Sequence, residues 1–192
     1  MRKAMKRLMA AATVGLAFCA LAAPAKKVKV DKSRILIAYY SWSGNTRAAA
    51  ESIARLTGGT LFEIRPAKPY PKEYRACANQ ARKEIRDKVY PELETRPDLS
   101  GFDVIFVGSP NWWGTMAPPV AAFLTDGALR GRTVVPFFTH GGGGMMNCEK
   151  DAQKLLKNSR VLKARTLHGD MAKTSEKDLA RWIGSLLEIT GR

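Results

Sequence analysis

Short apolar runs alternate along this chain with longer segments in which apolar residues recur at helical spacing. The runs have the length of strands and the near-continuous hydrophobicity of strands buried on both faces. They cover residues 34–40, 60–65, 102–108, 133–139 and 161–167. Strands that alternate with helices form a parallel sheet covered by helices on both faces. The pattern therefore predicts an α/β fold with five strands.

Segments with a 3.6-residue apolar period connect or follow these strands. We predict helices over residues 47–56, 72–89, 117–125, 148–158 and 176–189. Gly58 fits the end of the first helix, and Ser175 fits the N-cap of the last. One residue conflicts with the pattern, because Pro136 lies within the fourth predicted strand. Proline removes a backbone donor from the ladder and so argues against a central position for that strand.

The amino-terminal residues have a different pattern, in which Arg2, Lys3, Lys6 and Arg7 precede an uncharged run over residues 8–21. Small residues follow the run, and this three-part layout is typical of a secretory signal peptide. A transmembrane anchor is the alternative. The run has 14 residues, however, whereas a spanning helix needs about 20. We therefore expect the protein to be exported.

Cleavage after Ala22 or after Ala25 satisfies the preference for small residues at the cut. We expect a signal peptide over residues 1–25, a flexible lead-in over 26–33 and one folded domain over 34–192. With the leader removed, no membrane span is expected to remain, and the protein is expected to be periplasmic or extracellular. A domain of this size buries roughly 70% of its unfolded surface, which is enough for one substantial core.

The chain is strongly basic, with 32 lysines and arginines against 17 acidic residues and a formal net charge of +15. Removing residues 1–25 takes away four positive charges and no acidic residue, which leaves +11. Such a balance suits nucleic acid, an anionic membrane or an acidic partner. Export and the lack of a recognition motif argue against nucleic acid. A solvated basic surface and an acidic partner both remain open.

Two cysteines remain after Cys19 is removed with the leader, in a compartment that permits disulfides. Because Cys77 and Cys148 fall on different predicted helices, we expect free thiols rather than a disulfide. No histidines and cysteines have the spacing of a metal site, so no metal ligand is predicted.

The turn after the first strand consists of Ser41, Trp42, Ser43, Gly44, Asn45 and Thr46. It offers hydroxyl groups, an amide side chain and a glycine directly ahead of a predicted helix. Free backbone N–H groups and the positive end of the helix dipole favour a phosphate at such a position. An ordinary capped helix start is the alternative interpretation.

The sequence around this turn excludes several classes of phosphate-binding protein. The glycine and lysine spacing of P-loop NTPases is absent, and so is the glycine spacing of dinucleotide folds. The turn also lacks the cysteine and arginine of a low-molecular-weight tyrosine phosphatase. A cup without a nucleophile or a lysine binds phosphate without transferring it. We therefore predict an anchor for a cofactor, and no catalytic residue.

The loop after the third strand consists of Ser109, Pro110, Asn111, Trp112, Trp113, Gly114 and Thr115. Two adjacent tryptophans offer a flat apolar surface beside backbone polar groups, which suits a large heteroaromatic ring. The alternative is that one or both tryptophans fill the core.

The loop after the fourth strand consists of Thr139, His140, Gly141, Gly142, Gly143 and Gly144. Four consecutive glycines indicate a backbone that passes close to a bulky group or adopts positive φ. His140 suits a proton donor or a hydrogen-bond partner of the ring, and a purely structural histidine is equally compatible.

Taken together, the three loops resemble those of the flavodoxin family, in its branch of short members with a Trp-Trp-Gly loop. The resemblance covers about residues 34–190. It implies a flavodoxin-like three-layer sandwich, with a five-stranded parallel sheet in the order 2-1-3-4-5, and one noncovalent FMN. It further implies that Ser41–Thr46 hold the phosphate, and that Pro110–Gly114 and Thr139–Gly142 hold the isoalloxazine ring.

By this resemblance we expect an exported electron-transfer flavoprotein. An FMN-dependent reductase of quinones or similar small acceptors is one alternative, and a flavodoxin-fold binding module without flavin is another. Familiar flavodoxins are acidic and cytoplasmic, whereas this chain is basic, so we expect a different redox partner: an acidic protein or a small-molecule acceptor. Neither ring-binding loop contains an acidic residue, so we also expect the anionic reduced flavin to be less disfavoured here.

Overall fold

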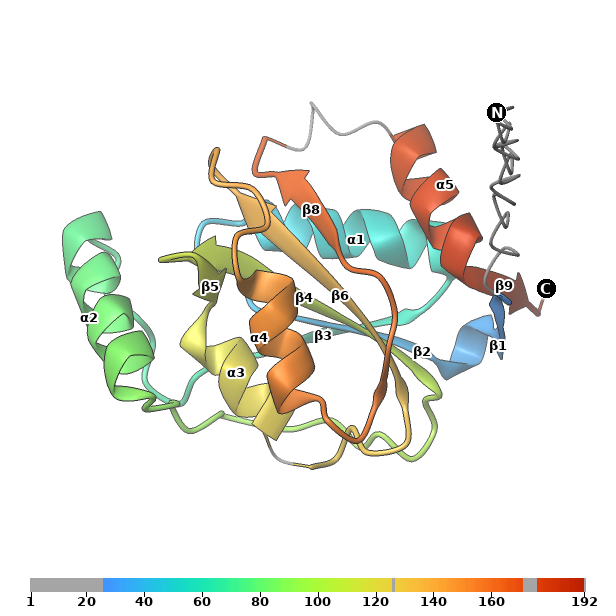
Figure 1. Cartoon of the computed structure of the whole chain (residues 1–192), viewed down its shortest axis with the longest axis horizontal. Coiled ribbons are helices and arrows are strands. Elements are labelled where there is room, and N and C mark those ends of the chain that lie inside the picture. The colour runs from blue at the N-terminus through green and yellow to red at the C-terminus, as the bar shows by residue number, and fades with distance from the viewer. Residues whose placement is uncertain (1–25, 126, 171–175, 192) are drawn as a thin grey trace, which may run out of the picture.

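The computed structural model describes residues 26–125, 127–170 and 176–191. In this part of the chain a twisted sheet lies between two helical layers (Figure 1). One layer contains α1 (Asn45–Thr57) and α5 (Glu176–Leu186). The other contains α2 (Tyr74–Asp87), α3 (Pro118–Thr125) and α4 (Cys148–Leu155). The α/β architecture predicted from the apolar pattern is confirmed.

The main sheet has seven strands, five of which lie on one hydrogen-bonded path. The path runs through β3 (Thr60–Glu63), β2 (Ile35–Tyr39), β4 (Val104–Trp112), β6 (Thr133–His140) and β7 (Arg160–Val161). Its pairings are all parallel. β5 (Thr115–Met116) pairs antiparallel with β4, and β8 (Arg165–His168) pairs parallel with β6.

The expected number of five strands is therefore too low. The fifth predicted strand, 161–167, is interrupted at residues 162–164 and forms β7 and β8. The loop after the third predicted strand also folds back on itself as the short β5. Two-residue strands such as β5 lie below the length at which a period-two apolar pattern can be recognised.

Both faces of the sheet are buried, and β2 shows how. Ile35, Ile37 and Tyr39 pack in the cluster formed with α1 and α5, whereas Leu36 and Ala38 pack in the cluster on the other face. Successive side chains of a strand point to opposite faces. This double burial explains why the strands of this chain are nearly continuous apolar runs.

The objection raised by Pro136 is wrong, because β6 lies in the interior of the sheet. Pro136 is aligned with Val107 of β4 on one side. On the other side, the pairing with β7 ends at Val134 and the pairing with β8 begins at Phe137. Val134 accepts a hydrogen bond from Leu162 on that outer side, and backbone groups two residues apart face the same neighbour. The missing N–H of Pro136 therefore falls where the outer neighbour is interrupted.

The two ends of the described domain also differ from expectation. β1 (Val28–Asp31), followed by a short 3-10 helix (Lys32–Arg34), occupies most of the predicted lead-in 26–33. The last helix ends at Leu186 rather than Ile189, and β9 (Leu187–Thr190) pairs with β1 in parallel as a separate two-stranded sheet. The helical pattern fails there because Leu187 turns into the core beside Val30, so tertiary packing overrides the local period.

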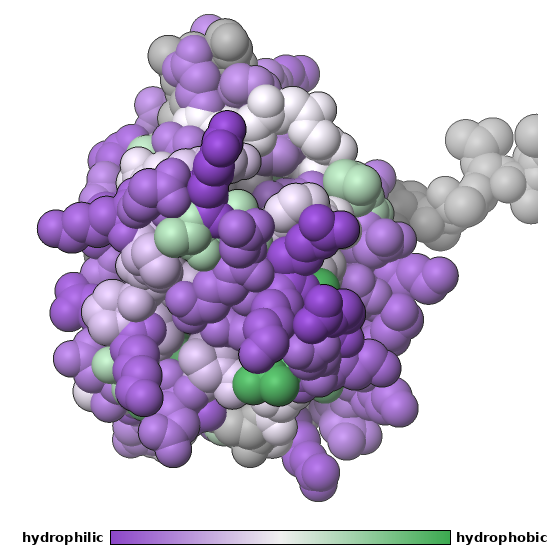
Figure 2. Space-filling model, turned by 90° about the vertical axis from the view of Figure 1, so that its left-hand side faces the viewer, coloured by the Kyte–Doolittle hydropathy of each residue, from purple (hydrophilic) through white to green (hydrophobic). Residues whose placement is uncertain are grey.

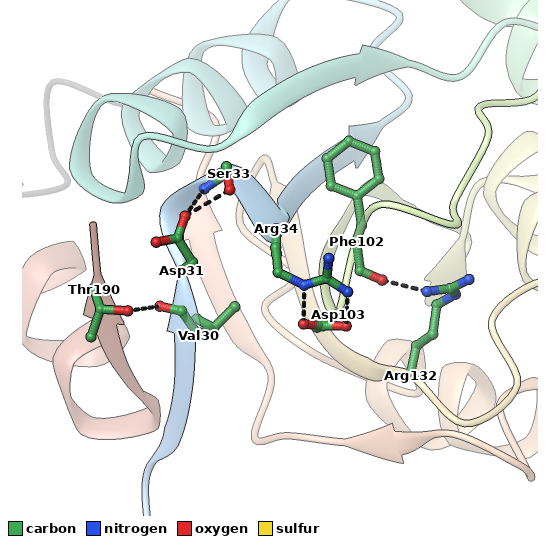
Figure 3. Close-up of polar contacts among 8 residues, drawn as sticks. All are labelled: Val30, Asp31, Ser33, Arg34, Phe102, Asp103, Arg132 and Thr190. Carbon is green, nitrogen blue, oxygen red and sulfur yellow. Dashed lines mark hydrogen bonds and ion pairs between the residues drawn. The ribbon is translucent and has the colours of Figure 1, made fainter. Parts of the chain in front are cut away.

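Polar contacts hold this corner of the molecule (Figure 3). The Thr190 hydroxyl donates to the Val30 carbonyl at 3.3 Å. Arg34 forms a two-point ion pair with Asp103, which joins the 3-10 helix to the start of β4. The guanidinium lowers the pKa of the Asp103 carboxyl by hydrogen bonding to it.

None of the helices in the described ranges has the length and apolar character needed to cross a membrane. Residues 1–25, predicted to be a signal peptide, and Ser175, predicted as the N-cap of α5, lie outside the described residues.

We expect the pairing of β1 with β9 to contribute measurably to the stability of the domain. Leu187 is 3% exposed, and we expect Leu187→Ala to lower the free energy of unfolding by about 2–4 kcal/mol through lost burial and the cavity left behind. Lys29 is exposed in the partner strand, so Lys29→Ala should change the free energy of unfolding by less than about 0.5 kcal/mol. Urea denaturation measures both. Equal effects would show that the pair is not part of the core.

Candidate functional site

The three loops singled out in the sequence meet at the edge of the sheet where β2, β4 and β6 end. Because these strands are parallel and adjacent, their carboxyl ends lie side by side. A direct hydrogen bond links two of the loops, between the hydroxyls of Thr46 and Thr139 at 2.7 Å, and both side chains are buried. The sequence prediction that these loops form one site is consistent with this placement.

The turn after β2 forms a shallow cup at the start of α1. Gly44 is the N-cap residue, with φ of 91°, and it receives no side-chain cap. Its own N–H donates to Ser41 Oγ at 3.1 Å. The first helical hydrogen bond runs from Ala48 to the Gly44 carbonyl, so the N–H groups of residues 45–47 point out of the helix end. Such groups, with the helix dipole, favour an anion.

Space is available in front of this cup. A Cβ placed on Gly44 would meet no atom within 4 Å, and Ser43, Gly44 and Asn45 are exposed. Trp42 turns away from the cup, since its indole N–H donates to the Pro71 carbonyl at 3.0 Å. The cup is therefore open and polar, with room in front of it.

The two adjacent tryptophans have different environments. Trp112 is half-buried against the core and packs edge-on against Tyr40 and Tyr70, with ring centroids at 5.6 Å and 5.1 Å. Trp113 is 55% exposed. It occupies the two-residue turn between β4 and β5 together with Gly114, with φ of 53° and 84° respectively.

Positive φ at both turn positions is the geometry preferred by tight hairpins, but it is unusual for a bulky side chain. Two contacts hold Trp113 in this conformation. Its indole N–H donates to the Ala78 carbonyl at 2.9 Å, and the Arg82 guanidinium lies 4.9 Å from the ring centroid. Trp112 is thus half-buried against the core, and Trp113 presents a ring at the site.

Asn111 joins this hairpin to the glycine loop. Its Nδ2 donates to the Gly144 carbonyl at 2.7 Å, and its Oδ1 accepts from Gly114 N–H at 3.0 Å. A cavity of about 390 Å³ lies between the two loops. It is lined by Asn111, Trp113, Gly114, His140, Gly141, Gly143 and Met146. Ligand pockets typically measure about 300–1,000 Å³, so the space suits a multi-ring group.

His140 is held in one tautomer at this cavity. Its Nδ1 accepts from Gly142 N–H at 3.1 Å, and its ring lies edge-to-face with His168 at 5.6 Å. Burial, followed by the charge of His168, lowers the pKa of His140. The neutral form therefore predominates at pH 7, with its proton on Nε2 as a hydrogen-bond donor.

Sequence reasoning missed a fourth strand end. His168 ends β8 and Gly169 follows it. A Cβ on Gly169 would lie 2.6 Å from the Asn45 amide, so this backbone packs directly against the cup. The signal was present, because His168 is the residue that follows the fifth predicted strand. Met146 was missed as well, since nothing in its local sequence indicates that it lines the cavity.

The described residues carry no group of three or more metal-ligating side chains. Cys77 and Cys148 are free and buried, as expected. Burial raises the pKa of the Cys77 thiol to about 11 and that of Cys148 to about 12, so both stay protonated at neutral pH and are poor nucleophiles. These two thiols therefore supply no nucleophile to the site.

Comparisons with known proteins agree with this picture. The family model described as Flavodoxin matches residues 34–186. A putative flavoprotein from Bacteroides uniformis superimposes with a TM-score of 0.71 and 31% identity, over 79% of this chain and 98% of that one. A flavoprotein from Lactobacillus acidophilus, solved in complex with FMN, gives a TM-score of 0.65 and 25% identity, over 78% and 99%.

A curated relative from Cupriavidus metallidurans, named NAD(P)H dehydrogenase (quinone), is 32% identical over 124 residues. The match covers 57% of this chain and 60% of the relative. The chain thus spans about 60% of the length of the curated relatives that it matches.

The hydrogen bond between Thr46 and Thr139 predicts non-additive stability effects. Replacing either residue by valine leaves the other buried hydroxyl without this partner, and we expect each change to cost about 1–3 kcal/mol. The double variant should cost less than the two single changes together, by about 1 kcal/mol. Urea denaturation of the four proteins closes the cycle. Strict additivity would show that the two hydroxyls do not interact.

Proposed function

We infer that this chain, which belongs to the flavodoxin family, binds one FMN at the carboxyl edge of its sheet and acts in electron transfer. The observation that carries this inference is the placement of an open anion cup and a ring-sized cavity on one edge, joined by the Thr46–Thr139 hydrogen bond. This combination suits a ligand with a phosphate at one end and a planar ring system at the other. FMN supplies the redox chemistry, and the protein sets its orientation, access and potential.

We assign the phosphate to the turn after β2. Ser41, Ser43 and Asn45 supply polar side chains, and the backbone of residues 42–46 supplies N–H groups. The buried Thr46 hydroxyl is engaged with Thr139, so this side chain fixes the cup in place.

We assign the isoalloxazine ring to the cavity between the two loops that Asn111 joins. Of the two predicted ring-binding loops, Asn111, Trp113 and Gly114 line the cavity from the first, and His140 and Gly141 line it from the second, together with Gly143 and Met146. The neutral His140 imidazole holds a proton at Nε2 that it can donate to a ring carbonyl or nitrogen. Trp113 provides a ring face beside the flavin, which favours stacking or edge contact.

We further propose that the protein is exported and meets its partner outside the cytoplasm. The tripartite pattern of residues 1–25 supports this proposal, and the net charge of +11 without them favours an acidic redox partner. Arg2-Lys3 is not a twin-arginine pair, so the chain crosses the membrane unfolded and acquires FMN afterwards.

A second candidate function is the reduction of quinones or similar small acceptors by bound FMN. The names of the curated relatives favour it, although the chain covers about 60% of their length. Steady-state reduction of a quinone by a reduced nicotinamide would favour the enzyme over the carrier. A flavodoxin-fold module without flavin would give a colourless protein that does not bind added FMN.

FMN binding and the role of the cup can be tested together. The purified protein should show the visible bands of oxidised flavin, or gain them on addition of FMN. Gly44→Ala should weaken FMN binding about tenfold, because the alanine relaxes out of the left-handed region in the free protein and must return to it, at a cost of about 1–2 kcal/mol, before the cup can hold the phosphate. Titration with quenching of flavin fluorescence gives the Kd. Gly101→Ala provides the control, because Gly101 also faces open space but has no positive φ. An equal loss of FMN affinity in this control would contradict the assignment of the phosphate to the cup.

The absence of acidic residues from residues 109–119 and 139–147 predicts a less negative midpoint potential than that of an acidic flavodoxin. Met146 is exposed and lines the cavity, so Met146→Glu should lower the potential of bound FMN by tens of millivolts, on the order expected for one added charge near the ring. Met146→Gln, which has the same shape without the charge, should leave it nearly unchanged. Redox titration of the three proteins provides the measurement, and equal shifts would refute the electrostatic explanation.

A further inference from the structure

A pocket of about 370 Å³ lies between the carboxyl end of α2, the start of α3, and α4. In the described part of the chain, no residue lines both this pocket and the flavin cavity. We propose that the pocket binds an amphipathic organic acid, which is a molecule with an apolar body and a single carboxylate. Its apolar walls are formed by Ile85, Tyr90, Met116, Pro118, Ala121 and Leu155.

The pocket is open because α2 ends beside it. Lys88 is the C-cap residue, with φ of 53°, and its N–H donates to the carbonyls of Glu84 and Ile85. A left-handed residue at this position stops the helix and turns the chain. The next two side chains stay at the surface, since Val89 is 57% exposed and Tyr90 is 38% exposed.

These exposed apolar side chains stand out from their surroundings. Figure 2 faces the α2 end of the molecule and shows strongly hydrophobic side chains low on a mainly hydrophilic face. Apolar surface that is rimmed by polar groups marks a binding site more often than a scattered single residue does. Tyr90 both lines the pocket and meets solvent, so an occupant that covers its ring removes apolar surface from water.

The floor of the pocket consists of small and adaptable side chains. Pro118 and Ala121 lie three residues apart on α3, so they face the same side of the helix, and both are buried. Met116, at the end of β5, is 3% exposed and completes the floor. The alanine leaves space that a larger side chain would fill, and the unbranched methionine adapts to the shape of an apolar occupant.

The charged side chains of the pocket favour an anion. Both carboxylate oxygens of Asp151 are already engaged, because Lys154 Nζ donates to one at 2.7 Å and the Thr115 hydroxyl to the other at 2.9 Å. Burial opposes ionisation of Asp151, but these hydrogen bonds outweigh it and lower the pKa of the carboxyl. The side-chain amine of Lys88 has no partner within the described ranges. Two lysines against one aspartate leave a net charge of +1 at the pocket.

The size and charge of the pocket together select the class of occupant. A volume of about 370 Å³ falls within the roughly 300–1,000 Å³ of ligand pockets, so it accepts an apolar body of about ten heavy atoms. A sugar or a zwitterion would bury polar groups against apolar walls without hydrogen-bond partners. A cation would meet the uncompensated lysine charge. A straight-chain acid and a ring acid both have the required chemistry.

Two probes test the proposal and distinguish these sources, decanoate as a chain acid and 2-naphthoate as a ring acid. Ligands of this size are expected to bind with a Kd of about 1 mM or tighter, which isothermal titration calorimetry measures. The tighter of the two identifies the kind of acid. Saturating FMN blocks the flavin cavity, which otherwise offers a second place for a flat ring. Acids that bind only without FMN, or that fail to bind at about 5 mM, would overturn the proposal.

Filling the pocket from its floor tests where the acids bind. Ala121→Leu should weaken binding of the tighter acid about tenfold or more, because the occupant and the added side chain compete for one space. Ala76→Leu, on the exposed surface of α2, provides the control and should stay within roughly twofold of the unmodified protein. Leu155→Trp fills the space from the half-buried end of α4 if Ala121→Leu does not fold. Unchanged binding in a folded, filled variant would overturn the proposal.

Removing the free lysine tests the role of charge. Lys88→Gln should weaken 2-naphthoate binding about threefold, as expected for one exposed ion pair. Lys83→Gln, also exposed on α2 but outside the pocket, should leave the Kd nearly unchanged. 2-Naphthamide has the shape of 2-naphthoate without its charge, so it should bind more weakly and should not respond to Lys88→Gln. Equal binding of the acid and the amide would overturn the assignment of an acid to this pocket.

Discussion

The parallel alignment of β2, β4 and β6 is the constraint on which the rest of the site depends. Because these neighbours run in one direction, loops that lie about 30 to 100 residues apart in the sequence begin at the same edge. Two side-chain links then fix the loops relative to one another: Thr46 with Thr139, and Asn111 with the glycine loop. A site built in this way is held by the sheet rather than by the loops themselves, which keeps the cup and the cavity at a fixed separation.

The main strands, the helices and the three loops could be predicted from the sequence because each has a local signal. The different environments of the two tryptophans could not be predicted. They depend on Tyr40, Tyr70 and α2, which are distant in the chain. The interior position of Pro136 depends on a break in another strand. In each case the deciding partner is nonlocal, and local propensity carries no information about it.

The same reasoning applies to what was not anticipated. β9 has a helical apolar period, and only its pairing with β1 makes it a strand. The cup could be recognised from composition, but the packing of Gly169 against Asn45 depends on how β8 ends. The α2 segment was predicted as an amphipathic helix, yet its small buried face gains meaning only from the indoles opposite it.

The pairing of β1 with β9 gives this domain a high contact order. The hydrogen bond from Thr190 to Val30 joins residues 160 positions apart, and contacts of such long range form late, because closing the loop between them costs entropy before any contact is gained. During folding, β1 therefore stays unpaired until β9 reaches it. The sheet that carries the cofactor loops can assemble before this, whereas the small sheet completes the fold and ties its two ends together.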